Sequence, residues 1–487
     1  MKKLALAAVL VFVAVLLVRT AMFTPPIFTA PAAPADTLVS DSAAAARLAA
    51  AVRIRSVSWS DSAPAREPLL AMQRLLEAQY PRVHHALTRE VIAGYSLLYT
   101  WRGTDSTLAP VVLMGHLDVV PVEAAAESAW HHGPFSGDIA DGFIWGRGTL
   151  DDKVSVLAAL EAVESLLAEG FTPRRTVMLA FGHDEEVLGS GADSIVQRLR
   201  ARGVHPQFVM DEGSAITEGI FPGVARPLAI IGVAEKGYAS VELSVDGGGG
   251  HSSAPPRETT IGILAAAIVR LERDPFPARL RGPTAGLLDA AGRSMPFASR
   301  IPFANRWLFS PLIVRKLAAD PVTDAMLRTT TAPTMISGSP KDNVLPHHAS
   351  AVVNFRIIPD DSVAGVLARV TEVIADPRVH VRLRGEARSE PSPVSGTDTP
   401  GYRAIAEAVQ EVDPGAIVAP SLVIAATDSR HYALITRDIY RFLPFTLRPG
   451  DIGRIHGVDE RLSVADYGRA IRFLRRLVRI SAGGAAP

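Results

Sequence analysis

Residues 111–118 read VVLMGHLD, and this stretch decides the fold class of the chain. The apolar run from 109 to 114 is uninterrupted, as is typical of a strand buried on both faces of a parallel sheet. The chain becomes polar directly afterwards, at His116 and Asp118. In open parallel sheets the carboxyl ends of the strands face the ligand crevice. The stretch therefore predicts a buried strand that ends with an imidazole and a carboxylate at this crevice, although His116 taken alone is better explained as a loop residue than as a ligand.

Strands and helices alternate on both sides of this stretch. Helices are expected at 41–54, 68–79, 154–168 and 195–202, and buried strands at 175–181, 207–210 and 228–233. Residues 400–481 return to the same α/β character. Such alternation predicts an α/β fold with a mostly parallel sheet that carries helices on both faces.

A second pattern begins near residue 237. Residues 239–245 alternate between polar and apolar side chains, as a strand with one solvated face does. The elements expected after it are a helix at 260–272, strands at 331–337 and 350–358, a helix at 362–375 and a strand at 379–383. This β-α-β-β-α-β order predicts a ferredoxin-like α+β sandwich at 237–390, inserted into a first domain made of 41–236 and 391–481. Two domains also suit a chain of 487 residues, in which 482–487 would be a tail.

The composition excludes several classes of function. Fifty basic side chains balance fifty acidic ones, which gives no reason to expect nucleic acid as a partner. The chain contains no cysteine, so disulfides, a thiolate nucleophile and cysteine-ligated metals are excluded. A metal ion would therefore be held by histidine, aspartate and glutamate.

The N-terminal segment has the form of an export signal. Two lysines precede an apolar run at 4–18, and Arg19 follows it. A membrane span usually needs ~20 residues, so residues 1–23 are either a secretory signal peptide or a signal anchor. An uncleaved anchor is favoured, because prolines crowd the region where a cleavage site would lie, and 24–40 is expected to be a linker. The rest of the chain is then expected on the exported side of the membrane, periplasmic or extracellular, or secreted if the segment is cleaved.

Acids and histidines recur at four other points where strands or turns should end. The stretches are 146–153 (GRGTLDDK), 181–186 (FGHDEE), 210–213 (MDEG) and 454–460 (RIHGVDE). Each has an ordinary explanation, since Asp152 suits a helix N-cap and a run of charges is usually a solvated loop. Together they favour one site of carboxylates and imidazoles at the edge where strand ends converge, which suits a metal ion.

These stretches, in this order and at this spacing, resemble the M20 metallopeptidases. Within that family the chain is similar to the branch that contains carboxypeptidase S and N-fatty-acyl-amino-acid synthase/hydrolase, from about residue 41 to 479. The stretches that mark this branch are 146–153, 343–346 with 354–359, and 427–432. The resemblance implies a zinc-peptidase-type α/β fold in which 237–390 is a lid and dimerisation domain.

The resemblance also implies a centre of two zinc ions, or of cobalt or manganese held by the same ligand types. Asp151 is expected to bridge the two ions. His116 and Asp211 are expected to complete the ligands of one ion, and Glu186 and His456 those of the other.

Five further residues take their roles from the same resemblance. Asp118 is expected to orient the histidine two residues before it, and Glu185 to act as general base and acid. His251 matches a lid histidine that reaches across a homodimer to the partner's oxyanion. Asn343 and Arg356 match binders of the substrate's carbonyl and carboxylate, a role that suits the planar fork of arginine. A structural salt bridge would also account for Arg356.

The expected reaction is hydrolysis of an amide bond next to a free carboxylate, in an N-acyl amino acid or a short peptide. A carboxypeptidase acting strictly on short peptides would use the same residues. A non-catalytic, membrane-tethered interaction protein on this fold would be expected to lack Glu185 or a metal ligand. The segment 275–320 can be an ordinary long insertion, but its apolar residues, such as Phe297 and Trp307, favour contact with lipid or with an apolar substrate.

Overall fold

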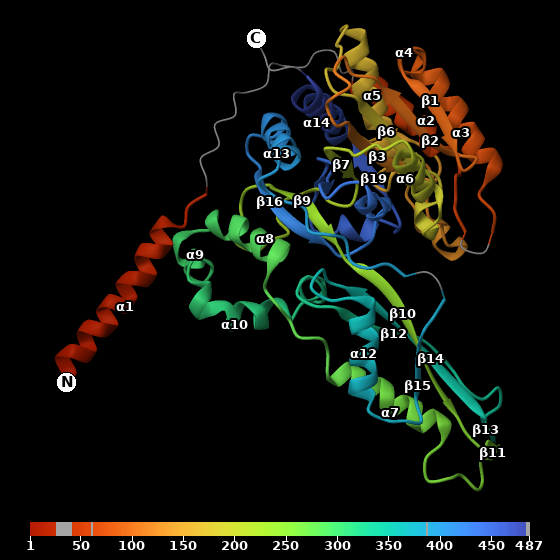
Figure 1. The fold of residues 1–487 in the computed structure, drawn as a ribbon, viewed down its shortest axis with the longest axis vertical. Helices are drawn as coiled ribbons and strands as arrows, with labels where there is room; N and C mark the ends of the chain where they lie inside the picture. The colour runs from red at the N-terminus through yellow and green to blue at the C-terminus, as the bar shows by residue number, and fades with distance from the viewer. Residues whose placement is uncertain (26–40, 60–61, 386–387, 484–487) are drawn as a thin grey trace.

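The structure is a computed structural model that describes residues 1–25, 41–59, 62–385 and 388–483. A larger α/β part is joined to a smaller α+β part, and an N-terminal helix projects from the molecule (Figure 1). Nearly all of the expected linker at 24–40 and most of the tail at 482–487 lie outside the described residues.

The larger part is built on a ten-stranded sheet in the order β1-β2-β6-β3-β7-β17-β9-β8-β18, with β16 beside β9. The pairings of β3 with β6 and β7, and of β7 with β17, are parallel and form its centre. The strands are β1 (Thr88–Ile92), β2 (Ser96–Trp101), β3 (Val111–His116), β6 (Val177–Gly182), β7 (Phe208–Asp211), β8 (Ile216–Thr217), β9 (Leu228–Glu235), β16 (Ile417–Val423), β17 (Ile439–Arg441) and β18 (Thr446–Leu447).

Helices cover both faces of this sheet, which confirms the predicted fold class. One core joins the sheet to α2 (Asp41–Val52), α3 (Arg66–Gln79), α4 (Pro81–Ala86), α5 (Lys153–Ala168), α13 (Pro400–Val412) and α14 (Val464–Ala482). A second core joins the opposite face to α6 (Gly191–Ala201) and the 3-10 helix η3 (Asp428–Leu434).

Strand β3 shows why its sequence is continuously apolar. Val111 and Leu113 belong to the core on one face, whereas Val112 and Met114 belong to the core on the other. All six residues of the strand are buried. A strand with two buried faces requires apolar side chains at successive positions, so this prediction is confirmed.

The smaller part, called the lid below, is an antiparallel sheet in the order β12-β14-β10-β15. The strands are β10 (Gly237–Asp246), β12 (Thr330–Ser337), β14 (His348–Ile357) and β15 (His380–Leu383), and the helices α7 (Thr260–Arg273) and α12 (Val363–Ile374) share its core. This is the predicted ferredoxin-like arrangement. β10 pairs with β14 from Gly237 opposite Ile357, at the junction with the larger part, to Asp246 opposite His348, at the far end (Figure 1).

Two of the chain segments that join these parts, the one at Tyr238 and the one at Ser389, are hydrogen-bonded to each other. The amide of Tyr238 donates to the carbonyl of Ser389, and the amide of Ser389 donates to the carbonyl of Tyr238, both at 2.9 Å. A Cβ on Gly237 would lie 2.6 Å from the backbone of Ser389 and Pro391. Glycine at this position therefore allows the two segments to approach closely.

Several short elements do not follow from the sequence pattern. They are the sheet of β4 (Ile139–Ala140), β5 (Phe143–Trp145) and β19 (Arg461–Ser463), the pair of β11 (Gly250–His251) and β13 (Val344–Leu345), and the 3-10 helices η1 (Ala124–Ala129), η2 (Glu185–Val187) and η4 (Ile452–Arg454). Such elements are too short to give a periodic signal, because their pairing is set by contacts between distant segments.

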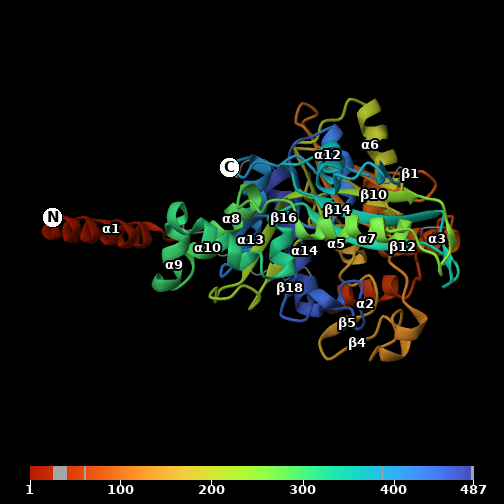
Figure 2. The same cartoon turned by 90° about the horizontal axis from the view of Figure 1, so that it is seen from below.

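The insertion at 275–320 and the N-terminal segment are both helical. The insertion contains α8 (Gly282–Arg293), α9 (Phe297–Ala304) and α10 (Arg306–Leu317), and α11 (Pro321–Ala325) follows it. The N-terminal segment forms α1 (Lys2–Met22), a continuous helix of 21 residues that is long and apolar enough to cross a membrane. It projects from the molecule beside α9 (Figure 2).

Candidate metal centre and substrate-binding residues

The acidic stretches are carried to one region by the parallel centre of the sheet. His116 is the last residue of β3 and Asp211 the last of β7, while Glu185 and Glu186 lie in η2, just after β6. Asp151 lies in the turn before α5. Because β6, β3 and β7 are adjacent and parallel, their carboxyl ends lie at the same edge, where the crevice of such sheets is expected.

Asp151 lies between two histidines from distant parts of the chain. Its Oδ1 is 3.0 Å from Nε2 of His116, and its Oδ2 is 3.0 Å from Nε2 of His456. The same nitrogen of His456 is 3.3 Å from Oε2 of Glu186. Each carboxylate oxygen of Asp151 thus faces a different imidazole, which is the arrangement needed to share one carboxylate between two cations.

The side chains of this cluster fit a divalent cation. Ligand atoms of His116, Asp151 and Glu186 all lie within 4.8 Å of one another. Oε1 of Glu186 is buried and has no hydrogen-bond partner among the described residues. A buried polar atom without a partner is costly, so this oxygen is available to a ligand.

The surrounding charges also favour cations. Burial raises the pKa of Asp152 and Glu212, and neighbouring carboxylates raise both further. Burial raises the pKa of Asp428 to about 8, despite the nearby charge of Arg430. Carboxylates crowded in this way resist ionisation unless positive charge is added, and divalent ions would supply it.

Asp118 connects His116 to the loop that carries the two glutamates. Its Oδ1 lies 3.2 Å from Nδ1 of His116. Its two oxygens also accept hydrogen bonds from the amides of Glu185 and Glu186, each at 3.2 Å. Burial would raise the pKa of Asp118, but the hydrogen bond and charge of His116 hold it below its usual value. An ionised carboxylate in this position fixes both the imidazole and the loop.

Glu185 is buried beside the cluster and retains protons strongly. Burial raises its pKa well above the usual value, and the negative charges of Asp428 and Glu186 raise it further, while the charge of His116 opposes them. A high proton affinity is what a carboxylate needs in order to accept a proton and later return it.

A hydrogen bond from the stretch 427–432 holds the side chain of Asp211. Its Oδ2 accepts a hydrogen bond of 2.9 Å from the amide of Ser429, which belongs to the stretch 427–432. Burial raises the pKa of Asp211, and the charge of His116 acts in the opposite direction. Asp211 is thus buried at the same sheet edge as His116. It does not belong to the close group formed by His116, Asp151 and Glu186.

The sequence patterns assigned no role to Arg147 and Glu460, which form a buried pair at this centre. Oε1 of Glu460 accepts hydrogen bonds from the amides of Gly148 and Leu150 at 2.9 and 2.8 Å, and Oε2 bonds the guanidinium of Arg147. Arg147 also donates to the carbonyl of His456 at 2.9 Å. The pair joins the turn before Asp151 to the loop of His456. In the sequence, this pair was indicated only by the position of Glu460, four residues after His456.

His456 has a backbone conformation that few side chains adopt. Its φ is +61°, in the left-handed region. Residues other than glycine occupy this region at an energetic cost and usually at sites that the surrounding structure holds in place. The bond from Arg147 to the carbonyl of His456 is one such restraint.

His251 and Asn343 lie together at the far end of the lid, away from the metal cluster (Figure 1). His251 in β11 pairs with Val344 in β13, and the amide of Ser252 donates to the carbonyl of Asn343 at 3.1 Å. The side chain of His251 is exposed, and Oδ1 of Asn343 is buried without a hydrogen-bond partner among the described residues.

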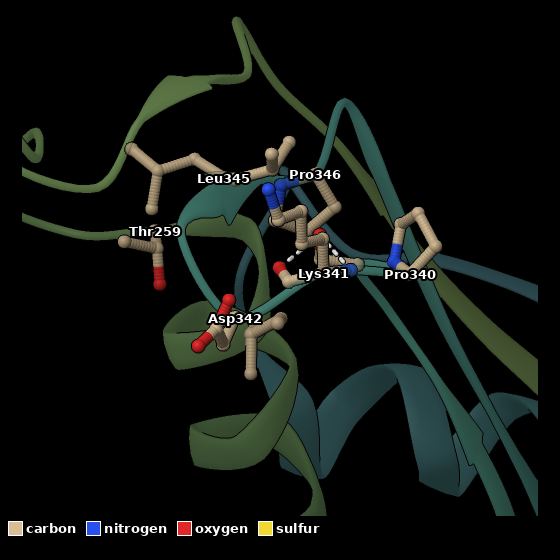
Figure 3. A pocket seen from close by; sticks show the side chains of 9 residues that line it. Thr259, Pro340, Lys341, Asp342, Leu345 and Pro346 are labelled. Carbon is tan, nitrogen blue, oxygen red and sulfur yellow. Dashed lines mark hydrogen bonds between the residues drawn. The ribbon is translucent and has the colours of Figure 1, made fainter.

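A hollow lies beside this end of the lid. It is lined by Thr259, Pro340, Lys341, Asp342, Leu345 and Pro346, among others (Figure 3). It is separated from the acidic cluster by the length of the lid sheet, so it is not the reaction site of its own chain.

Arg356 lies at the opposite end of β14, next to the junction. His348, at the far end of β14, pairs with the last residue of β10. Arg356 lies eight residues farther along β14, a distance of roughly 27 Å at ~3.4 Å per residue. Its guanidinium lies over the ring of Tyr238 at 5.0 Å, and no carboxylate of the described chain is within salt-bridge distance of it. A second cation is nearby, because the charge of Arg356 adds to burial in lowering the pKa of Lys236 to about 7. The structural salt bridge considered for Arg356 is thus not found among the described residues.

Comparisons with a family model, with curated proteins and with solved structures all indicate M20 peptidases and their relatives. Residues 112–480 match the family described as "Peptidase family M20/M25/M40". The chain is 42% identical to "Probable carboxypeptidase S-like 2" of Dictyostelium discoideum over 449 residues, which cover 91% of this chain and 86% of that protein. It is 43% identical to an N-fatty-acyl-amino acid synthase/hydrolase of Danio rerio over 437 residues, which cover 88% and 84%. Its fold is similar to that of an M20 family metallo-carboxypeptidase of Sulfolobus solfataricus, with a TM-score of 0.66, 19% identity and coverage of 90% and 98%.

The Arg147–Glu460 pair generates a prediction that does not depend on the reaction. Glu460→Gln should lower the free energy of unfolding by about 3 kcal/mol, because breaking a buried ion pair leaves an uncompensated charge. It should also weaken metal binding by about ten- to a hundredfold, as loss of a ligand-supporting contact does. Urea denaturation of the metal-free protein and competition with a chromophoric chelator measure the two effects. Asp105→Asn, which breaks an exposed salt bridge with Arg174, is the control and should change neither. Unaltered metal affinity in Glu460→Gln would show that the pair does not hold the ligands.

Proposed function

The chain belongs to peptidase family M20/M25/M40, in the branch of carboxypeptidase S and the N-fatty-acyl-amino acid synthase/hydrolases, and on that basis we propose that it hydrolyses an amide bond next to a free carboxylate. The substrates are N-acyl amino acids or short peptides. The observation that carries the proposal is the position of Asp151 between His116 and His456, with Glu185 buried beside them.

The proposed centre holds two divalent ions, zinc in the first instance. Asp151 would be shared by both ions, since its two oxygens face different histidines. His116 and Asp211 would help to hold one ion, and Glu186 and His456 the other. Bound ions would polarise the carbonyl of the amide and lower the pKa of the attacking water.

Glu185 moves the proton. It takes a proton from the water as the new carbon–oxygen bond forms, and it gives that proton to the leaving nitrogen as the carbon–nitrogen bond breaks. Burial and acidic neighbours raise the pKa of Glu185 in the chain alone, and the positive charge of bound ions would keep the carboxylate ionised until it accepts the proton. Asp118 holds the His116 ring and the loop of Glu185 in fixed positions relative to each other.

Arg356 is the proposed binder of the substrate carboxylate. The guanidinium lies over an aromatic ring and has no acidic partner in the described chain, so its charge is free for a ligand. Two parallel hydrogen bonds to a carboxylate would fix the end of the substrate and place its amide. A free carboxylate next to the scissile bond is the common feature of the two substrate classes.

We propose that His251 and Asn343 act on the metal centre of a partner subunit in a homodimer. Both lie at the far end of the lid, where they cannot reach their own cluster without a large movement (Figure 1). The free edge of the lid sheet supports such an assembly. β12 is an edge strand, and its Met335 and Ile336 are 56% and 65% exposed. An exposed apolar edge is a surface for pairing with another chain.

Residues 237–390 act as the lid and dimerisation domain in this proposal, and 41–236 with 391–481 as the catalytic domain. α1 is proposed to remain as an uncleaved anchor, with the rest of the chain on the exported side. Its continuity over 21 residues and its almost complete exposure support this assignment. A carboxypeptidase restricted to short peptides is the second candidate, because the similar proteins include both kinds of enzyme.

The metal assignment predicts different outcomes for two substitutions. Purified protein should contain close to two divalent ions per chain and lose activity on chelation. Asp151→Ala should lose both ions, because the shared ligand is removed. Glu185→Gln should keep both ions and lose activity by roughly two to four orders of magnitude. Elemental analysis and hydrolysis rates measured on the same samples test this, and a fully active Glu185→Gln enzyme would exclude the mechanism.

The dimer assignment is tested by mixing inactive chains. Glu185→Gln mixed with His251→Ala, or with Asn343→Ala, should recover activity after subunit exchange, because one of the two mixed sites then receives every functional residue. Glu185→Gln mixed with Arg356→Ala should gain nothing above the residual activity of Arg356→Ala, since Arg356 and Glu185 serve the same site. This last mixture is the matched control. If exchange is demonstrated and neither of the first two mixtures gains activity, His251 and Asn343 do not act across the dimer.

The carboxylate-binding role predicts equal effects from two different changes. Arg356→Ala, or amidation of the substrate carboxylate, should each lower kcat/KM by about one to two decades, as expected for loss of a charge-assisted contact of roughly 1.5–3 kcal/mol. Combining them should cost little more, because they remove the same interaction. Arg356→Lys should recover part of the rate, and Arg382→Ala on β15, whose arginine pairs with Glu242, should have no effect. Equal cleavage of the amidated and free substrates would replace this function with that of an endopeptidase or general amidase.

A further inference from the structure

The N-terminal helix is packed against the insertion by a buried polar contact. Asn305, between α9 and α10, is fully buried, and its Nδ2 lies 3.3 Å from the carbonyl of Leu16 and 3.3 Å from Oγ1 of Thr20. Thr20 is also fully buried, although most of α1 is exposed. A buried hydrogen bond between two apolar segments restricts their relative position.

Further contacts extend along the second half of α1. The ring of Phe12 lies edge-on to the ring of Trp307 at 6.0 Å. Near the other end, Arg293 lies over the ring of Phe23 at 4.4 Å and donates to the carbonyl of Thr24 at 3.1 Å. From residue 12 to residue 22 a helix rises about 15 Å at 1.5 Å per residue. α9 and the beginning of α10 therefore lie beside α1 over roughly half the ~30 Å thickness of a bilayer's hydrocarbon core.

The outward surface of the insertion is apolar where it accompanies α1. Trp307 and Leu312 on α10 are each 58% exposed, and Phe297 on α9 is 47% exposed. At the end of α10 the exposed residues become basic, at Arg315 and Lys316. A short helix with an apolar outer face and basic residues at one end has the features of a segment that lies in a membrane interface.

The insertion is also fixed to the large sheet. α8 shares a core with β9 and β16, through Leu287 and Ala291 against Leu228, Ile417 and Ala419. The helices α8, α9 and α10 therefore connect the edge of the catalytic sheet to α1 without a break (Figures 1 and 2).

We infer that α9 and α10 enter the lipid bilayer beside α1, and that lipid hydrocarbon covers the apolar face formed by Phe297, Trp307, Leu308 and Leu312. This rests on the proposed anchor, because a bilayer crossed by α1 must also surround whatever packs along its second half. Arg315 and Lys316 then lie at the headgroups of the leaflet on the exported side, where they attract anionic lipids. The catalytic part is held against the membrane by a folded platform.

Site-directed spin labelling tests the depth of each segment in the full-length protein. The chain contains no cysteine, so single substitutions give unique labels. Leu308→Cys and Leu312→Cys report on the insertion, Val11→Cys on α1, and Val91→Cys on an exposed apolar position of β1 as the aqueous control. Each variant is reconstituted in vesicles of phosphatidylcholine and phosphatidylglycerol, and collision rates are measured with oxygen and with a water-soluble nickel chelate.

The ratio of oxygen to nickel accessibility should be several-fold higher at positions 308, 312 and 11 than at position 91. A lipid-buried label at 11 with water-exposed labels at 308 and 312 would overturn the inference and leave the anchor intact. A water-exposed label at 11, or a mature protein that lacks α1, would overturn both. Spin–spin broadening at 312 that disappears on dilution with unlabelled chain would assign the face to a second copy instead. Hydrolysis of an N-acyl amino acid by each variant is measured separately, so failure of the proposed reaction would be seen independently of depth.

Discussion

The crowding of carboxylates around Asp151 is the constraint on which the rest of the structure depends. Asp151 is within 3.0 Å of two imidazoles from distant parts of the chain, and further acids surround it, each raising the pKa of its neighbours. Such a pocket persists only if the backbone is held rigidly and positive charge is supplied. The buried pair of Arg147 and Glu460 holds the backbone, since it bonds both the turn before Asp151 and the carbonyl of His456. The imidazoles and the proposed divalent ions supply the charge.

The lid carries the residues of two proposed substrate contacts at opposite ends of one strand. Arg356 lies at the junction end of β14, and Asn343 lies beyond its other end, next to His251. In the proposed homodimer, one chain would supply the carboxylate binder of a site and its partner the residues at the far end of the lid. Each site would then depend on both chains.

The insertion has a comparable connecting role on the other side of the molecule. α8 is fixed to β9 and β16, while the loop residue Asn305 bonds to α1. Neither contact is visible as a pattern, because Asn305 and Thr20 are far apart in sequence and look like ordinary polar residues. The apolar residues of 275–320 did indicate contact with something other than water, but their position beside α1 required the folded chain.

The sequence by itself determined the fold class, and its resemblance to the M20 metallopeptidases indicated the residues of the candidate centre. The continuous apolar run at 109–114 requires a strand with two covered faces, and polar residues directly after such strands must emerge at one edge of a parallel sheet. These are local signals, because burial and strand direction are set by neighbouring residues. Only the tertiary structure decided which side chains support the centre and which are kept apart. Glu460, Asn305 and the separation of Asn343 from Arg356 all depend on contacts between segments far apart in the chain, which periodicity and spacing do not record.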